Sequence, residues 1–118
     1  MPATDLKKTL DSSKELEITV TGRKTGKKIT LPIWFVRDGE KLLFLPVRGS
    51  ESNWYRNVKH SSTMGISAGG TSMTAKARPT ESAERARAVA EKFRAKYGAA
   101  DVKKYYSKFD ASVEVTLP

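Results

Sequence analysis

Short β-patterned segments joined by glycine-containing turns constrain the fold of this chain more than any other feature. Residues 15–20 alternate polar and apolar side chains, the pattern of a half-buried strand. The dipeptides Asp38-Gly39 and Gly69-Gly70 each separate two β-rich runs, and both favour a two-residue hairpin turn. Six such runs with few helices predict a mainly β (α+β) domain, built as a six-stranded antiparallel barrel. Closure of the barrel removes open sheet edges.

Two to four short helices accompany these strands in the predicted fold. Residues 52–60 have Ser50 or Ser52 as a candidate N-cap. The clearest helical pattern covers residues 81–98, with Thr80 as its predicted N-cap and Gly98 past its end. Its predicted apolar face consists of Ala86, Val89, Ala90, Phe93 and Tyr97. A helical turn around 101–109 and a weak helix around Leu6 and Leu10 complete the prediction.

Length and composition exclude several classes of protein. The 118 residues are predicted to form one domain over residues 1–118. No apolar run approaches the ~20 residues that a membrane span needs, and the first residues lack the apolar core of a secretory signal. We therefore expect a cytoplasmic protein, with membrane association left open. Without cysteine and with one histidine, the chain lacks the ligands of a zinc cluster, so we expect no metal.

A cluster of cations marks the candidate binding region. Arg23, Lys24, Lys27 and Lys28 fall within six positions, and the whole chain has a net charge of +9. Such a balance attracts nucleic acid, anionic lipid or small phosphorylated and carboxylated ligands. Composition alone does not choose among these partners.

The predicted hairpin at Asp38-Gly39 places an anion pocket at this cluster. With Arg37 opposite Glu40, three pairs follow: Trp34 with Leu43, Leu31 with Pro46, and Ile29 with Arg48. This register brings Arg48 and the N-terminus of the 52–60 helix to the basic loop, and helix N-termini attract anions. Three side chains are placed to offer flat surfaces to a ring: Trp34, Trp54 and Tyr55. Because the chain has no evident acid–base set, a bound cofactor is the natural source of its chemistry.

Three segments give this sequence a family resemblance. They are T-G-R-K-T-G at 21–26, L-P-I-W-F-V-R-D-G at 31–39 and N-W-Y-R-N at 53–57. Over about residues 16–68 the chain closely resembles the deazaflavin-dependent nitroreductase family, whose members are split β-barrels related to pyridoxamine-phosphate-oxidase-like flavoproteins. The C-terminal half is similar only in layout.

The resemblance implies an oxidoreductase that uses reduced deazaflavin, coenzyme F420, with flavin mononucleotide (FMN) as the alternative cofactor. The implied reaction is hydride transfer to an electrophilic small molecule of the nitro, quinone or activated alkene class. Homodimers are common among such barrels.

The resemblance also assigns residues to roles. Trp34 and Tyr106 are the implied catalytic residues, with Tyr105 as an alternative to Tyr106. The phosphate and tail of the cofactor would contact Arg23, Lys24, Thr25 and Lys28. The ring and ribityl chain would contact residues 29–34, which include Ile29, Pro32, Ile33 and Trp34, and the ring edge would contact Leu45, Pro46, Val47 and Arg48. The pocket would be closed by Asn53, Trp54, Tyr55, Arg56 and Asn57.

Two further functions stay in view. A basic barrel with surface aromatic residues suits the binding of single-stranded nucleic acid. Against it, the cations gather at one loop and no RNA-binding signature is present, so we expect no nucleic-acid partner. The other is a carrier that holds the cofactor without turnover.

Overall fold

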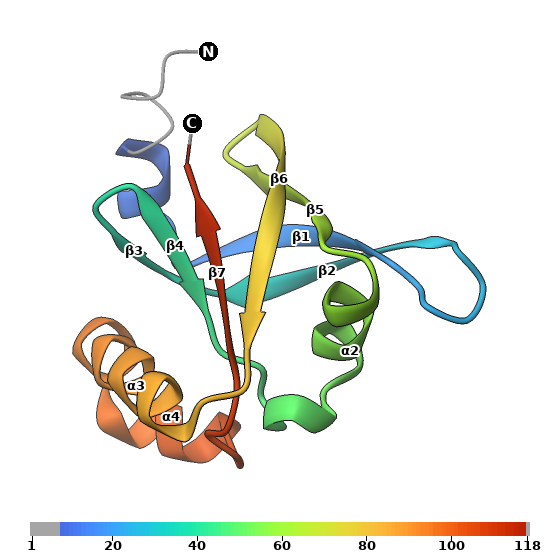
Figure 1. Cartoon of the computed structure of the whole chain (residues 1–118). Coiled ribbons are helices and arrows are strands. Elements are labelled where there is room, and N and C mark those ends of the chain that lie inside the picture. Colours follow the sequence, from blue (N-terminus) through green and yellow to red (C-terminus); the bar gives the residue numbers. More distant parts are fainter. Residues whose placement is uncertain (1–7, 118) are drawn as a thin grey trace.

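One curled antiparallel sheet forms the centre of the computed structural model, which describes residues 8–117 (Figure 1). Its strands are β1 (Glu15–Thr21), β2 (Lys28–Trp34), β3 (Val36–Asp38), β4 (Lys41–Phe44), β5 (Thr63–Ala68), β6 (Thr71–Thr80) and β7 (Ser112–Thr116). The helices are η1 (Gly49–Glu51, a 3-10 turn), α2 (Asn53–His60), α3 (Ala83–Tyr97) and α4 (Ala99–Tyr105), preceded by a helical segment at residues 8–11. The predicted mainly β, α+β barrel is confirmed. Leu6, placed in the predicted N-terminal helix, lies outside the described residues.

The sheet curls because one chain segment supplies both of its ends. The strand order is β2-β1-β5-β6-β7-β4-β3, and β2 and β3 are separated only by Phe35. Residues 28–38 therefore leave β1 at Phe35 and continue alongside β4, which bends the sheet round on itself. The break divides one predicted strand into β2 and β3, so the sheet has seven strands and not the six that were predicted. Phe35 is fully buried, so its backbone groups need partners at the break.

The β3–β4 hairpin turns one residue later than predicted. Asp38 stays in the strand and pairs with Lys41, so Gly39 and Glu40 form the turn. Gly39 has a φ of 61°, and no non-glycine residue described has a positive φ. Positive φ at the first turn position only is the pattern of a type II′ turn, which needs glycine there. The predicted pairs Trp34–Leu43, Leu31–Pro46 and Ile29–Arg48 are therefore wrong: Val36 pairs with Leu43, and Trp34 pairs with Glu15 on β1.

The second predicted hairpin is confirmed. Gly69 and Gly70 join β5 to β6 and have φ values of 55° and 80°. Two consecutive positive φ angles are typical of a type I′ turn, whose twist matches that of the flanking strands.

Strand β4 joins two hydrophobic cores. Leu42 and Phe44 point into the barrel, whose core also contains Trp54, Tyr55 and Val58 of α2. Leu43 and the following Leu45 point to the other side and pack under α3 and α4. Burial on both faces explains the continuous apolar run in this strand, since each such side chain contributes roughly 1.5–3 kcal/mol.

Helix α3 covers the outer side of β4 with most of its predicted face. Ala86, Val89, Ala90 and Phe93 are buried, and Tyr97 packs partly buried against the same cluster. The N-cap is Ser82 rather than the predicted Thr80, because Thr80 still belongs to β6 and the Ser82 hydroxyl accepts a hydrogen bond from the Arg85 N–H. Gly98 ends the helix with a φ of 96°, as predicted.

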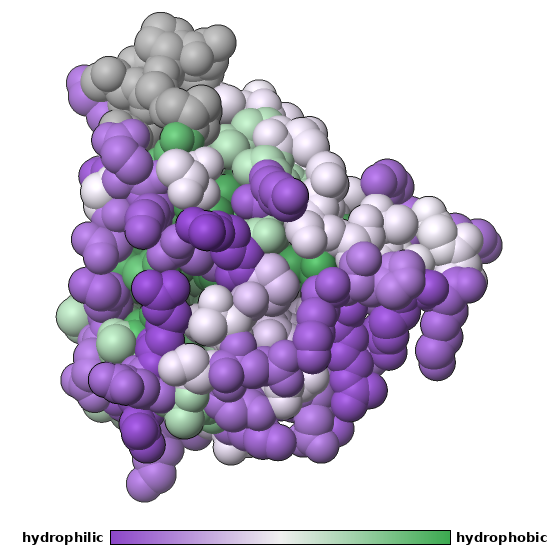
Figure 2. Space-filling view, viewed as in Figure 1, coloured by the Kyte–Doolittle hydropathy of each residue, from purple (hydrophilic) through white to green (hydrophobic). Residues whose placement is uncertain are grey.

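The surface is largely hydrophilic on the face shown in Figure 2. Hydrophilic side chains also cover the hairpin loop between β1 and β2, which projects from the body at the right of Figure 1. Within residues 8–117 no helix combines the length and apolar character that crossing a membrane requires.

Candidate functional site

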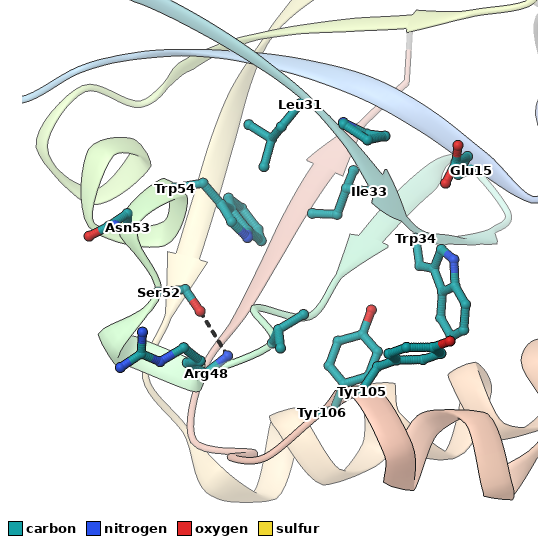
Figure 3. A pocket seen from close by; sticks show the side chains of 12 residues that line it. Glu15, Leu31, Ile33, Trp34, Arg48, Ser52, Asn53, Trp54, Tyr105 and Tyr106 are labelled. Atoms are coloured by element: carbon teal, nitrogen blue, oxygen red, sulfur yellow. Dashed lines mark hydrogen bonds between the residues drawn. The ribbon is translucent and has the colours of Figure 1, made fainter.

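A cavity of about 500 Å³ opens where β2, α2 and the end of α4 meet (Figure 3). We call it the aromatic cavity, and it is lined by Glu15, Leu31, Pro32, Ile33, Trp34, Val47, Arg48, Ser52, Asn53, Trp54, Tyr105 and Tyr106. Four consecutive residues of β2 contribute to it, so both faces of this strand contact the cavity. Its size lies within the range of small-molecule sites, and such sites combine apolar walls with few polar groups.

A second cavity of about 300 Å³ lies against the basic loop. We call it the loop cavity, and it is lined by Gly22, Arg23, Lys24, Thr25, Ile29, Asn53 and Asn57. Asn53, the first residue of α2, lines both cavities. The aromatic cavity and the loop cavity are therefore neighbours that meet at the start of α2.

Asn57 fastens the basic loop to α2. Its buried side-chain oxygen Oδ1 accepts hydrogen bonds from the Arg23 backbone N–H at 3.1 Å and from Arg23 Nη1 at 2.8 Å. The same Nη1 lies 3.4 Å from the Asn53 carbonyl oxygen. Within the loop, Gly22 and Lys27 close the turn through an N–H···O bond of 2.8 Å. The loop is thus held in one position against the helix, because a single buried acceptor binds both the backbone and the side chain of Arg23.

The cations of this loop are largely unneutralised. Lys24, Lys27 and Lys28 are exposed, and the Lys28 ammonium donates to Thr21 Oγ1 at 2.8 Å. Among the ion pairs formed by residues 8–117, none joins Arg23, Lys24, Lys27 or Lys28 to a carboxylate. Arg23 and Lys24 line the loop cavity, so their positive charge is available to an anion there.

Trp34 forms one wall of the aromatic cavity and is held by three tyrosines. Its ring stacks on Tyr97 with centroids 4.1 Å apart and planes 7° apart. Tyr105 meets it edge to face at 5.5 Å, and Tyr106 lies at 6.1 Å with a tilted ring. The Tyr97 hydroxyl accepts a hydrogen bond from the Phe35 N–H at 3.1 Å. Lys96 Nζ donates to the Phe35 carbonyl at 2.9 Å, so α3 satisfies the backbone at the strand break.

Tyr106 offers a protonated hydroxyl to the aromatic cavity. Its ring is buried against Phe93 and Trp34, and Figure 3 shows the hydroxyl pointing up into the cavity. Burial raises the pKa of Tyr106 well above its ordinary value. A group with a raised pKa stays neutral at physiological pH, so this hydroxyl keeps its proton and can donate a hydrogen bond.

The C-terminal segment fixes the loop that carries Arg48. The Ser107 N–H donates to the Val47 carbonyl at 2.9 Å. Asp110 accepts from the Ser50 N–H at 2.8 Å and from the Ser50 hydroxyl at 2.6 Å. Burial raises the pKa of Asp110, but these two hydrogen bonds and the Lys108 charge outweigh burial and lower it. The carboxylate is therefore ionised and anchors η1, directly after Arg48.

The Ser52 side chain connects this loop to α2. The Ser52 hydroxyl accepts from the Arg48 N–H at 2.9 Å, drawn as the dashed line in Figure 3. Ser52 is the N-cap of α2, yet its side chain does not cap the N–H groups of the first helical turn. The Ser52 hydroxyl therefore joins the Arg48 backbone to the start of α2 and leaves the first helical turn without a side-chain cap.

Most of the residues predicted for the site line one of the two cavities. Those at the aromatic cavity are Pro32, Ile33, Trp34, Val47, Arg48, Asn53, Trp54 and Tyr106, and those at the loop cavity are Arg23, Lys24, Thr25, Ile29, Asn53 and Asn57. The structure brings these two groups together through the docking of the loop on α2, and not through the pairing of Ile29 with Arg48 that the sequence predicted.

Five predicted residues lie outside both cavities. Leu45 and Pro46 are buried behind the cavity wall, and Tyr55 is 1% exposed in the barrel core. Burial, reinforced by the Glu81 carboxylate, raises the pKa of Tyr55 to about 12. Lys28 lines a groove on the outer face of β1, β5 and β6, and Arg56 is exposed with Nε 3.5 Å from the Ser50 carbonyl oxygen. The structure therefore does not bring these five residues to either cavity.

Two lining residues were not predicted: Glu15 and Ser52. Leu31 lies within the predicted range 29–34. Glu15 enters the site only because β1 pairs it with Trp34, and no local pattern marks that pair.

The chain belongs to the family described as "Uncharacterized protein conserved in bacteria (DUF2255)", whose model matches residues 5–116. A comparison with curated proteins found no match.

Solved structures share its fold. An F420-H2 dependent reductase (FDR-A) is 24% identical with a TM-score of 0.66, over 86% of this chain and 93% of that one. A protein solved as a domain-swapped dimer is 22% identical with a TM-score of 0.67, over 95% and 92%. A Listeria innocua protein assigned as a pyridoxamine 5'-phosphate oxidase is 12% identical with a TM-score of 0.70, over 97% and 91%. The resemblance to deazaflavin-dependent and pyridoxamine-phosphate-oxidase-like split barrels is confirmed at the level of the fold.

Proposed function

We propose that this protein is an oxidoreductase that binds reduced deazaflavin, coenzyme F420, and reduces an electrophilic small molecule. One observation carries the proposal: an aromatic cavity meets a cationic cavity at Asn53. Such a pair suits a ligand that is a flat ring at one end and polyanionic at the other. Relatives of the same fold include an F420-H2 dependent reductase, which supports this choice of cofactor.

The chain's residues fit the cofactor at both ends. Ile33 and Trp54 would pack on its ring, with Trp34 on the substrate side, while Arg23 and Lys24 would hold its phosphate and acidic tail. Charge-assisted hydrogen bonds to such anions are about twice as strong as neutral ones. When bound, reduced deazaflavin supplies a hydride.

Two tasks remain for the protein. The walls of the aromatic cavity would orient the substrate against the cofactor ring and exclude water. For substrates that need a proton as well as a hydride, Tyr106 is the donor that we assign, because its hydroxyl is neutral and faces the cavity. Water would then reprotonate the tyrosine. Tyr105, half exposed at the mouth of the cavity, would contact the substrate.

FMN is the alternative cofactor, and the assigned oxidase relative from Listeria innocua supports it. FMN carries a single phosphate, whereas the loop presents four cations without carboxylate partners among the described residues. This excess favours a cofactor with several negative charges. The same excess would suit a nucleic acid, but the aromatic side chains here line a cavity of about 500 Å³, a size typical of small-molecule sites.

The proposal is tested by turnover. Purified protein is mixed with reduced F420, and a quinone, a nitroarene or an activated alkene is added while absorbance of the oxidised cofactor is followed. We expect one cofactor oxidised for each two-electron reduction of at least one acceptor. The control is the same mixture without protein. If the protein binds the cofactor tightly but oxidation does not exceed this control, the protein is a cofactor carrier and the enzyme assignment is overturned.

A homodimer is part of the same proposal. It is supported by the relative solved as a domain-swapped dimer. Sedimentation equilibrium tests it, and a monomer at all accessible concentrations would contradict it.

A further inference from the structure

The aromatic cavity has opposite charges at its two ends. Arg48 is the one cationic side chain among its lining residues, and Glu15 is the one carboxylate. Figure 3 shows Arg48 beside Ser52 and Asn53 at one end and Glu15 beside Trp34 at the other. The Arg48 end continues toward the basic loop, so an anionic cofactor would occupy that side. The Glu15 end remains for the substrate.

Glu15 and Trp34 form a cross-strand pair. They are Cα partners in the antiparallel β1–β2 ladder, so their side chains stand on the same face of the sheet. Both are at an edge of the cavity that is open to solvent, because Glu15 is exposed and Tyr105 is 50% exposed. A ligand can therefore reach the carboxylate and the indole together.

The rings at this end are arranged to attract positive charge. Tyr97 stacks behind Trp34 and Tyr105 meets it edge to face, so three electron-rich rings lie within one corner. Aromatic faces attract cations, and the nearby carboxylate adds to that attraction. The chain already places a cation here, because Lys14 Nζ lies 5.9 Å from the centre of the Trp34 ring.

We infer that the Glu15 end of the cavity selects aromatic substrates that carry a positive charge. Glu15 would contact the charge, and Trp34 and Tyr105 would contact the ring. Lys14 would be displaced, since it is an exposed side chain whose Nζ lies 5.9 Å from the centre of the Trp34 ring. The role as a substrate rests on the proposed function, but the binding preference does not depend on the cofactor.

Binding to the protein alone tests this inference. Calorimetric titrations compare three bicyclic probes of similar size: the N-methylquinolinium cation, neutral quinoline and quinoline carboxylate. We expect the cation to bind about tenfold more tightly than the anion. In Glu15→Gln the cation should lose about three- to tenfold in affinity, the range that a single cation–π or charge contact supplies. In Lys14→Ala the cation should bind more tightly, because its competitor is removed.

Glu17→Gln is the matched control. Glu17 is also exposed on β1 and its removal changes the net charge equally, but it does not line the cavity. The affinity of Glu17→Gln for the cation should stay within twofold of that of the unmodified protein. Equal binding of the three probes, or equal losses in the two glutamine variants, would overturn the inference. F420 binding is measured in a separate titration. If the protein binds F420 but does not prefer the cationic probe, this inference fails and the proposed function stands. If the protein prefers the cationic probe but does not bind F420, the cation site stands and the proposed function fails.

Discussion

Tyr97 holds Trp34 in place and joins the site to the strand break. Its ring stacks on Trp34 at 4.1 Å, and its hydroxyl lies 3.1 Å from the Phe35 nitrogen, 2.9 Å from the Phe35 oxygen and 2.5 Å from the Lys14 oxygen. Burial raises the pKa of Tyr97 to about 12, so the hydroxyl stays protonated. One side chain thus satisfies the backbone where β2 becomes β3 and supports the wall of the aromatic cavity.

Replacing Tyr97 by phenylalanine should therefore destabilise the fold while keeping the stacked ring. The buried Phe35 N–H would lose its partner, which costs about 1–3 kcal/mol in free energy of unfolding. Urea denaturation measures this loss. Tyr105 also contacts the Trp34 ring, but it is 50% exposed, so Tyr105→Phe should change stability by less than about 0.5 kcal/mol. Equal stability of the two variants would show that the Tyr97 hydroxyl does not hold the strand break.

At the scale of elements, the basic loop and the Arg48 loop flank the start of α2 from two sides. If both hold the anionic part of a cofactor, Lys24→Ala/Arg48→Ala should lower the affinity for F420 at least roughly tenfold, since charge-assisted hydrogen bonds contribute about 1.5–3 kcal/mol each. Calorimetric titration measures the affinity. The matched control is Lys76→Ala/Arg87→Ala, which removes two exposed cations outside both cavities. A similar loss in this control, or none in the first variant, would contradict the assignment.

Gly49 determines how the Arg48 loop meets the C-terminal segment. Its φ is 58°, and a Cβ atom there would lie 2.0 Å from Asp110 Oδ1. At Gly39, with a φ of 61°, a Cβ atom would meet nothing within 4 Å. Gly39→Ala should therefore cost only the left-handed backbone conformation, about 1–2 kcal/mol, and Gly49→Ala clearly more. Thermal unfolding measures the stability of both variants. Equal losses of stability would show that the Asp110 side chain moves away from the added Cβ at no cost.

At the scale of the whole molecule, local patterns were enough to predict the fold class and the barrel, but not the strand break at Phe35 through which the sheet curls. Alternation marked the strands, and Gly69-Gly70 marked a hairpin, because both signals depend on neighbouring residues. The break at Phe35 depends on Lys96 and Tyr97, about sixty residues later in the chain. No pattern near Phe35 contains that information, so the sequence predicted one continuous strand there.

The site followed the same division. The basic loop and the aromatic residues were recognisable by type and by resemblance, and most of them line the two cavities. Their relative positions were predicted from a hairpin register that was wrong, because the turn is formed by Gly39 and Glu40 and not by Asp38 and Gly39. The loop reaches the site because the buried Asn57 binds Arg23 across 34 positions of sequence. Such a long-range hydrogen bond leaves no local signal.

The net charge of +9 makes salt the variable that separates the proposed ligands. A single-stranded nucleic acid held by several cations loses affinity steeply with salt, with a log–log slope of about −0.7 for each phosphate contacted. Ring burial in the aromatic cavity is insensitive to salt, and at ~0.3 M salt the Debye length is already below ~8 Å. A deazaflavin should therefore stay bound under conditions that release an oligonucleotide.

The most direct test of the account is a titration of the protein with F420, FMN and a single-stranded oligonucleotide at ~0.3 M salt, the concentration at which screening separates them. We predict saturable F420 binding at one site per chain, weaker FMN binding and almost no oligonucleotide binding. Tight oligonucleotide binding without saturation by either cofactor would contradict the account. Trp34, Trp54 and the basic loop would then be a surface for stacking bases.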